Sequence, residues 1–240
     1  MVTDSNTQLS PTANESKSAS SKWLMVLELE YGLIQGRELL YAAAAEALKE
    51  RGVTLSPSDF SRTGLRCHPS HIAERLASGL HLKDTDLDAL NAAIVEKFHN
   101  NLLHGKVQTS SLVASLLEEG KRMNAQVAVI SSLPEDVAEA LLARIPGGSG
   151  PVKLFDSPEA DRTFPRVESW MKAARGVNRP PATCFAVASS QEASKSALAA
   201  GMKSIAVPDR FTAFQDFSGA DLVIDSDEDG SPGERLRDLV

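Results

Sequence analysis

The sequence predicts an α/β protein in which helices cover both faces of a parallel sheet and a helical segment is inserted after the first strand. The first observation is the apolar run at residues 23–29, which ends at a turn-like Glu-Tyr-Gly and is typical of a buried parallel strand. The second is the alternation of short apolar strands with amphipathic helices after residue 110. The third is the intervening stretch, which has helical periodicity and no convincing strand.

Each predicted element has a local signal in the sequence. The first helix, at residues 37–51, has apolar side chains at helical spacing and stops at Gly52. Ser110 or Ser111 can cap the helix that follows the insertion and runs to about Met123, and Pro134 suits the first turn of the next one. Further helices are predicted at residues 71–79, 84–103, 135–144, 167–175 and 192–200. Strands are predicted at residues 24–29, 126–130, 152–155, 184–187, 204–207 and 221–224.

These elements divide the chain into a core and a cap. Residues 22–36 and 105–240 are predicted to form the α/β core, and residues 37–104 the helical cap. Residues 1–21 are rich in Ser, Thr and Asn, which predicts a disordered leader; a degenerate targeting peptide is the alternative. The acidic segment at residues 225–233 contains Gly and Pro and is expected to be solvated.

Charge and cysteine content restrict the partners and the compartment. The net charge of −7 makes the average surface repel nucleic acid phosphates and anionic lipid headgroups, so neither a nucleic acid nor a membrane is an expected partner. The chain lacks both a long apolar span and the order of a signal peptide, which predicts a cytoplasmic protein. Cys67 and Cys184 lie far apart, which favours free thiols over a disulfide.

The most specific strings lie late in the chain. Cys-Phe-Ala-Val-Ala-Ser-Ser at residues 184–190 is followed by Ala-Leu-Ala-Ala-Gly-Met at 197–202 and by Phe-Gln-Asp-Phe-Ser-Gly-Ala-Asp-Leu-Val-Ile at 214–224. With the order of elements from residue 23 to 225, these strings resemble the haloacid dehalogenase-like superfamily, in its β-phosphoglucomutase and CbbY-like branch. The resemblance implies a Rossmann-like parallel sheet, a small helical cap after strand one and four motifs at the carboxyl ends of strands.

The first family motif has two aspartates, a nucleophile and an acid/base, separated by one residue. Glu28 and Glu30 occupy these positions here, and Tyr31 replaces the glycine that follows in the family. Each carboxylate is one methylene longer, and a displacement of roughly 1 Å can cost on the order of a hundredfold in rate. The two glutamates therefore have either a residual catalytic role or a structural one, hydrogen-bonded or solvated at a strand end.

The second motif is a phosphate-binding Ser or Thr at the end of the next strand. Ser131 matches it, with Ser132 beside it, and the resemblance implies that both bind phosphate. A Ser-Ser pair before Pro134 is also typical of an ordinary helix-capping turn, and this alternative stays open.

The third motif is a lysine followed by proline, which neutralises the nucleophile and the phosphate. Phe164 stands at the lysine position, followed by Pro165, so the positive charge is missing. Arg162 and Arg166 flank the position and could reach a phosphate, but arginine differs from lysine in reach and geometry.

The fourth motif supplies acidic residues that hold Mg²⁺. Ala188 and Ser189 stand at these positions, and Ser190 matches the family serine. Because Mg²⁺ needs carboxylate oxygens, we expect no metal site and no cofactor, with Mg²⁺ required only if the protein is an enzyme. Glu28 and Glu30 are expected to lie close together, with one carboxyl pKa raised by like-charge repulsion.

All histidines are predicted to lie in the cap. Cys67 and His68, with His71 three residues on, could ligate zinc, but no second cysteine pair completes such a site, and polar surface positions are the alternative. If the cap reads a ligand, the resemblance implies that it does so at residues 64–69. The histidines are His68, His71, His81, His99 and His104.

Three of the four motifs depart from the family together, which favours a pseudo-phosphatase that binds a phosphorylated metabolite or a protein partner. The first alternative is a Mg²⁺-dependent phosphatase or phosphomutase that acts on a sugar phosphate with Glu28 in place of the nucleophilic aspartate. The second alternative is a structural subunit of an assembly.

Overall fold

The computed structural model describes residues 22–65, 69–145, 152–156, 164–226 and 230–240. Its centre is a six-stranded sheet in which every neighbouring pair of strands is parallel, which confirms the predicted fold class. The strands are β1 Leu24–Glu28, β2 Gln126–Ser131, β3 Val152–Asp156, β4 Cys184–Ala188, β5 Lys203–Ala206 and β6 Leu222–Val223. Their order is β3-β2-β1-β4-β5-β6, so β1 lies between β2 and β4.

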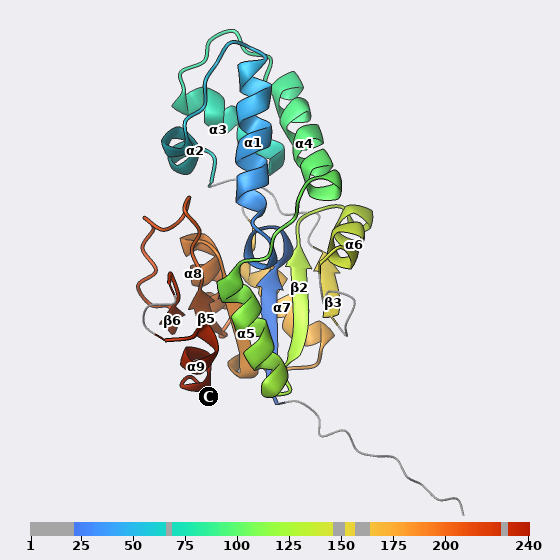
Figure 1. Cartoon of the computed structure of the whole chain (residues 1–240), viewed down its shortest axis with the longest axis vertical. Helices are drawn as coiled ribbons and strands as arrows, with labels where there is room; N and C mark the ends of the chain where they lie inside the picture. The colour runs from blue at the N-terminus through green and yellow to red at the C-terminus, as the bar shows by residue number, and fades with distance from the viewer. Residues whose placement is uncertain (1–21, 66–68, 146–151, 157–163, 227–229) are drawn as a thin grey trace, which may run out of the picture.

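Alternating side chains of β1 bury both faces of the sheet. Met25 and Leu27 belong to the cluster that includes α5 and α9, whereas Leu24 and Val26 belong to the cluster of α7 and α8. Figure 1 shows these two helical layers on opposite sides of the strands. The helices of the core are α5 Ser111–Arg122, α6 Glu135–Ala143, α7 Val167–Gly176, α8 Gln191–Ala199 and α9 Pro232–Arg237.

The cap is a group of helices beyond the carboxyl ends of the strands (Figure 1). Its helices are α1 Gly36–Lys49, α2 Pro57–Thr63, α3 Ile72–Gly79 and α4 Leu87–His104, with a short 3-10 turn η2 at Pro69–His71. Their apolar faces bury Phe60, Leu76 and Phe98, which belong to the same apolar cluster as Met25 and Leu27 of β1. None of the described helices is long and apolar enough to cross a bilayer.

Two features differ from the sequence predictions. The first strand ends at Glu28, because the chain then forms a single π-helical turn, η1, at Leu29–Leu33. The helices α2 and α9 and a 3-10 turn, η3, at Pro181–Thr183 were not predicted. Residues 1–21, the predicted leader, lie outside the described residues.

The prediction that residues 225–233 are solvated is wrong at its carboxyl end, since Pro232 and Gly233 are buried in α9. The cause is Glu119 of α5, a carboxylate only 3% exposed, which pairs with Arg237 at 2.9 Å and with Arg122 at 3.0 Å. A buried carboxylate needs such partners, and α9 supplies one of them. Residues 227–229 are not among those described.

The chain enters the cap through a close backbone approach at Gly36. A Cβ atom on this residue would lie 2.1 Å from the carbonyl oxygen of Glu30. Although alanine favours helices over glycine by about 1 kcal/mol, the Gly36→Ala variant should lose about 1–3 kcal/mol of unfolding free energy, because the backbone must shift. Urea denaturation measures this loss. Ala42→Ser, on the exposed side of α1, should stay within about 0.5 kcal/mol of wild type; an equal loss in both variants would contradict the prediction.

Candidate functional site

The candidate site lies where β1 ends between its two neighbours. Glu28 is the last residue of β1, and Glu30 follows in the π-helical turn. Both glutamate side chains are fully buried. Because β1 is flanked by β2 and β4, the loops that follow these two strands lie on either side of the glutamates.

The Glu30 carboxylate is held by the loop after β2. Its Oε1 atom accepts hydrogen bonds from Ser131 Oγ at 2.9 Å, Ser132 N–H at 2.6 Å, Ser132 Oγ at 3.0 Å and Leu133 N–H at 3.1 Å. The other carboxylate oxygen, Oε2, accepts no hydrogen bond from the described residues. Both predicted phosphate-binding serines therefore bind a side chain of the chain itself.

The Glu28 carboxylate is held by the loop after β4. Its Oε1 atom accepts hydrogen bonds from the N–H and the Oγ of Ser189, each at 3.0 Å. Among the described residues, none donates to its Oε2 atom. Each glutamate thus ties the end of β1 to a neighbouring loop.

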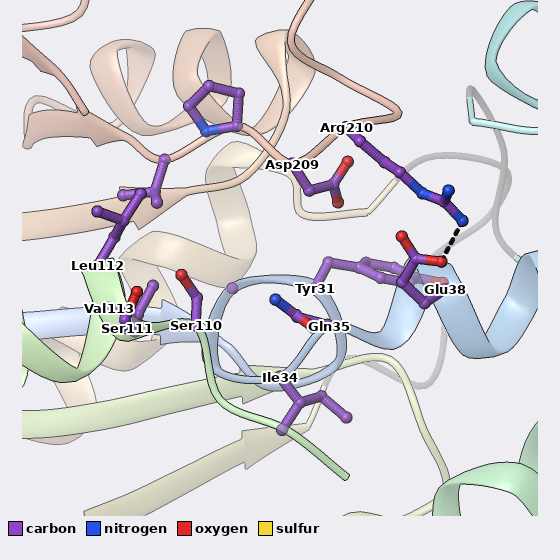
Figure 2. Close-up of a pocket in the computed structure, with 13 residues that line it drawn as sticks. Tyr31, Ile34, Gln35, Glu38, Ser110, Ser111, Leu112, Val113, Asp209 and Arg210 are labelled. Atoms are coloured by element: carbon purple, nitrogen blue, oxygen red, sulfur yellow. Dashed lines mark hydrogen bonds and ion pairs between the residues drawn. The ribbon is translucent and has the colours of Figure 1, made fainter. Parts of the chain in front are cut away.

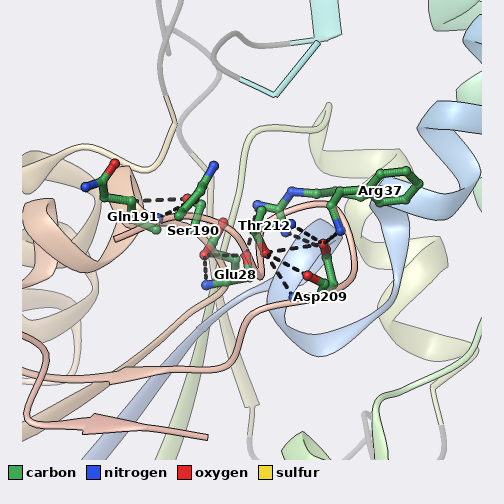
Figure 3. A network of polar contacts seen from close by, with 10 residues as sticks. Glu28, Arg37, Ser190, Gln191, Asp209 and Thr212 are labelled. Carbon is green, nitrogen blue, oxygen red and sulfur yellow. Dashed lines mark hydrogen bonds and ion pairs between the residues drawn. The ribbon is translucent and has the colours of Figure 1, made fainter. Parts of the chain in front are cut away.

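A buried arginine, which sequence reasoning missed, completes the site. Arg37, in the first turn of α1, is 5% exposed and donates from Nη1 to Asp209 Oδ2 at 2.9 Å and from Nη2 to Ser189 Oγ at 3.1 Å. Figure 3 shows Arg37 reaching from α1 toward Asp209, with Glu28 close by. Ser189 thereby links the guanidinium to the Glu28 carboxylate. One signal existed in the sequence. A cation in the first turn of a helix is unfavourable beside the positive end of the helix dipole, which indicates that an acidic partner lies nearby.

Burial dominates the protonation of both glutamates. It raises the pKa of Glu28 to about 7, although the nearby Arg37 and the Ser189 hydrogen bonds act to lower it. Burial also raises the pKa of Glu30, against the lowering effect of hydrogen bonds from backbone N–H groups, Ser131 and Ser132. The expected like-charge repulsion makes only the smallest contribution to the pKa of Glu28, so desolvation is the main cause.

The remaining motif positions contribute little to this network. Phe164 packs against the cluster of α7 and α8 and brings no charge. Ala188 is buried at the end of β4, and Ser190 Oγ accepts from Ala193 N–H to cap α8. Arg166 lies 3.9 Å from Glu168 on the surface, and Arg162 is outside the described residues.

The residues at the site do not fit a divalent cation. Glu28 and Asp209 are the carboxylates near the fourth-motif position, and the Arg37 guanidinium already provides positive charge to both. A second cation there would be repelled by Arg37, so no chemistry through a metal is assigned. Across the described ranges, no group of three His, Cys, Asp or Glu side chains is placed to hold a metal. Cys67 and His68, in the predicted cap segment 64–69, lie outside those ranges.

An open cavity of about 380 Å³ lies beside the site, between the start of the cap and the core. Figure 2 shows the residues that line it. Tyr31, Gln35 and Glu38 come from the stretch between the end of β1 and the first turn of α1, and the first turn of α5 and Asp209 form other parts of the wall. Glu38 forms an ion pair with Arg210 across it. Neither Glu28 nor Glu30 lines this cavity, so the two carboxylates are separate from the open space.

Comparison with known proteins identifies relatives by sequence. No family model matches the chain. Protein CbbY of Rhodobacter capsulatus is 27% identical over 151 residues, which cover 62% of this chain and 66% of that protein. A CBBY-like protein of Arabidopsis thaliana is 29% identical over 176 residues, 72% of this chain and 51% of that protein. The match therefore spans about half to just under two thirds of the length of these relatives.

Solved structures share the fold. A CbbY variant from Rhodobacter sphaeroides in complex with xylulose-(1,5)bisphosphate superimposes with a TM-score of 0.67 at 21% identity, over 85% of this chain and 93% of that chain. A β-phosphoglucomutase from Clostridium difficile gives a TM-score of 0.65 at 14% identity, over 91% of this chain and 98% of that chain.

The buried Glu28 predicts a characteristic pH dependence of stability. Its pKa is about 7 when folded and 4.5 ordinarily, so the folded state binds the proton more tightly. The contribution of Glu28 to the free energy of unfolding has its full value below about pH 4.5. It falls by about 3 kcal/mol as pH rises through about 7. The difference in unfolding free energy between wild type and Glu28→Gln, measured by denaturation from pH 4.5 to 8, should follow this curve. A difference independent of pH would show that Glu28 titrates normally.

Removing Arg37 should be costly. In Arg37→Met, the buried Glu28 and the partly buried Asp209 lose their cation, and we expect a loss of about 3–5 kcal/mol of unfolding free energy and a further rise in the Glu28 pKa. Denaturation and carboxyl carbon NMR titration measure the two effects. Lys97→Met is the control, because the ion pairs of Lys97 with Glu46 and Glu50 lie at the surface and their loss should change the unfolding free energy little. Similar losses in both variants would argue against a special role for Arg37.

Proposed function

Because the chain belongs to the haloacid dehalogenase-like superfamily, on the branch of CbbY and β-phosphoglucomutase, we propose that it is a pseudo-phosphatase that acts by binding a partner. One observation carries this proposal. The Glu30 carboxylate takes the hydrogen-bond donors of Ser131, Ser132 and Leu133, which a phosphoryl group would need.

The position of the nucleophile supports the same conclusion. A nucleophilic carboxylate must approach phosphorus closely, and small displacements cost rate steeply. Glu28 is fully buried, and its Oε1 is bound by both donors of Ser189. Its raised pKa also leaves a large fraction of the side chain protonated near neutral pH, which makes it a weaker nucleophile.

The distribution of positive charge adds a second argument. Phosphoryl transfer depends on cations that neutralise the charge developing on the phosphate. Phe164 supplies none, and both terminal nitrogens of Arg37 already donate to Asp209 and Ser189. A phosphate dianion would meet two buried glutamates without a free cation among the described motif positions.

The occupied site favours a protein partner over a phosphorylated metabolite. A phosphorylated small molecule would use the donors that Glu30 now holds, whereas a protein could bind the surface without them. A structural subunit is the limiting case, in which the partner is bound permanently. Co-purification with a partner, combined with the absence of thermal stabilisation by sugar phosphates, would support this form of the proposal.

One observation favours the alternative, a Mg²⁺-dependent phosphatase or phosphomutase. The Oε2 atom of Glu28 is buried but accepts no hydrogen bond from the described residues, so one oxygen of this carboxylate is not engaged by the loop after β4. In this alternative Glu28 would replace the aspartate nucleophile and act on a sugar phosphate.

Activity assays separate the two functions. We expect no phosphate release from generic or sugar phosphates at neutral pH, with or without Mg²⁺, and no rescue by Glu28→Asp alone, because the cations remain missing. Rescue should require Glu28→Asp, Glu30→Asp, Phe164→Lys and Ser189→Asp together. Glu28→Gln, purified in parallel, controls for contaminating phosphatases. Mg²⁺-dependent turnover by wild type that Glu28→Gln abolishes would overturn the pseudo-phosphatase proposal.

A further inference from the structure

We propose that the loop after β5 acts as a latch that holds the cap on the core without the help of a ligand. The loop spans residues 207–221, and the latch consists of Asp209, Arg210 and Phe211. Phe211 is inserted between two cap residues, Tyr41 of α1 and Phe60 of α2. The inference concerns the conformation of the chain and goes beyond the proposed function, because it holds for a binding protein and for an enzyme alike.

The first argument is an aromatic contact that joins the core to the cap. The ring centroid of Phe211 lies 5.5 Å from that of Tyr41 and 5.1 Å from that of Phe60. The two cap rings are themselves 5.4 Å apart, and the Phe60–Phe211 pair has the edge-to-face arrangement that aromatic rings favour. Phe211 is only 1% exposed, so lifting the cap off this loop would bring its ring into water.

The second argument is that the two residues before Phe211 also bind the cap. Asp209 accepts a hydrogen bond from Arg37 at 2.9 Å, and Arg210 forms an ion pair with Glu38 (Figure 2). The Arg210 guanidinium also lies 4.6 Å from the centroid of the Phe211 ring, within the range of a cation–π contact. Three successive residues of the loop therefore each contact the cap.

The third argument is that the loop is shaped to present this ring. Asp209 Oδ1 accepts hydrogen bonds from the N–H groups of Phe211 at 2.8 Å and of Thr212 at 3.2 Å. One carboxylate thus forms the turn through Oδ1 and binds the cap through Oδ2. Phe214, three residues further on, is 63% exposed, so the same loop carries one aromatic ring in the cap and another in solvent.

The apolar contact should dominate the energy of the latch. Burial of a phenylalanine side chain favours the closed arrangement by roughly ten- to a hundredfold, and the aromatic pairs add to this. The Arg210–Glu38 pair is about half exposed and adds little. The closed arrangement should therefore predominate in the free protein.

Pulsed electron spin resonance can measure the cap–core distance in the full chain. Spin labels are attached at Lys49→Cys in the cap and Glu118→Cys in α5, both exposed positions, after Cys67→Ser removes a competing thiol. Cys184 is buried and stays unlabelled. With no ligand or Mg²⁺ added, this protein should give a single cap–core distance.

A double variant removes the latch. Phe211→Ala deletes the inserted ring, and Asp209→Asn removes the charge that binds Arg37 while it keeps an oxygen for the turn. We expect a second cap–core distance in at least about a tenth of the folded molecules. If this variant does not fold, Phe211→Leu with Asp209→Asn, which keeps an apolar side chain, tests the same expectation.

The loop itself offers a matched control. Phe214→Ala with Asp216→Asn changes an exposed ring and an aspartate that forms a similar turn with Ser218 N–H at 2.8 Å, away from the cap. This control should keep the single distance. An unchanged single distance in the folded latch variant, a second distance already present in the unmodified loop, or equal second populations in the latch and control variants would each overturn the inference.

Discussion

The need to satisfy two buried carboxylates at the end of β1 organises this site. A carboxylate without exposed surface is costly unless neighbouring donors replace water, and here the loops after β2 and β4 supply them. Each glutamate therefore fixes a loop at the sheet edge, and the loops in turn fix the glutamates. The additional methylene of glutamate gives each side chain the reach to insert into the neighbouring loop.

The cap takes part in the same charge balance. Arg37 belongs to the first cap helix, yet its guanidinium lies among Asp209, Ser189 and Glu28 of the core. A positive charge on a side chain thus stands beside the loop after β4 that contains Ser189. The negative and positive charges of the site both come from side chains of the protein. Because these charges largely balance one another, the site attracts an external ion only weakly.

Much of the fold could be predicted from the sequence, because apolar periodicity and helix stops report local structure directly. The buried run of β1 and the helical stretch of the cap are examples. The pairing of Glu28 with Ser189 and of Glu30 with Ser131 could not be predicted, because it depends on which strands are neighbours and on how side chains turn after the strand ends. Arg37 and Asp209 are separated by 172 positions, and no local pattern links them. The helix α9 was missed although its start carries a local signal, since Ser231 and Glu234 form a capping box with Pro232 in the first turn.

The ion pairs between cap and core have a geometric consequence. Arg37 and Glu38 are adjacent on α1, and they face Asp209 and Arg210, which are adjacent in the loop after β5. A slip of the cap by one residue in either direction would bring Arg37 opposite Arg210 or Glu38 opposite Asp209, both like-charge encounters. These four charged residues therefore favour one alignment of the cap on the core. They act by making the neighbouring alignments unfavourable, more than by the stability that either ion pair adds.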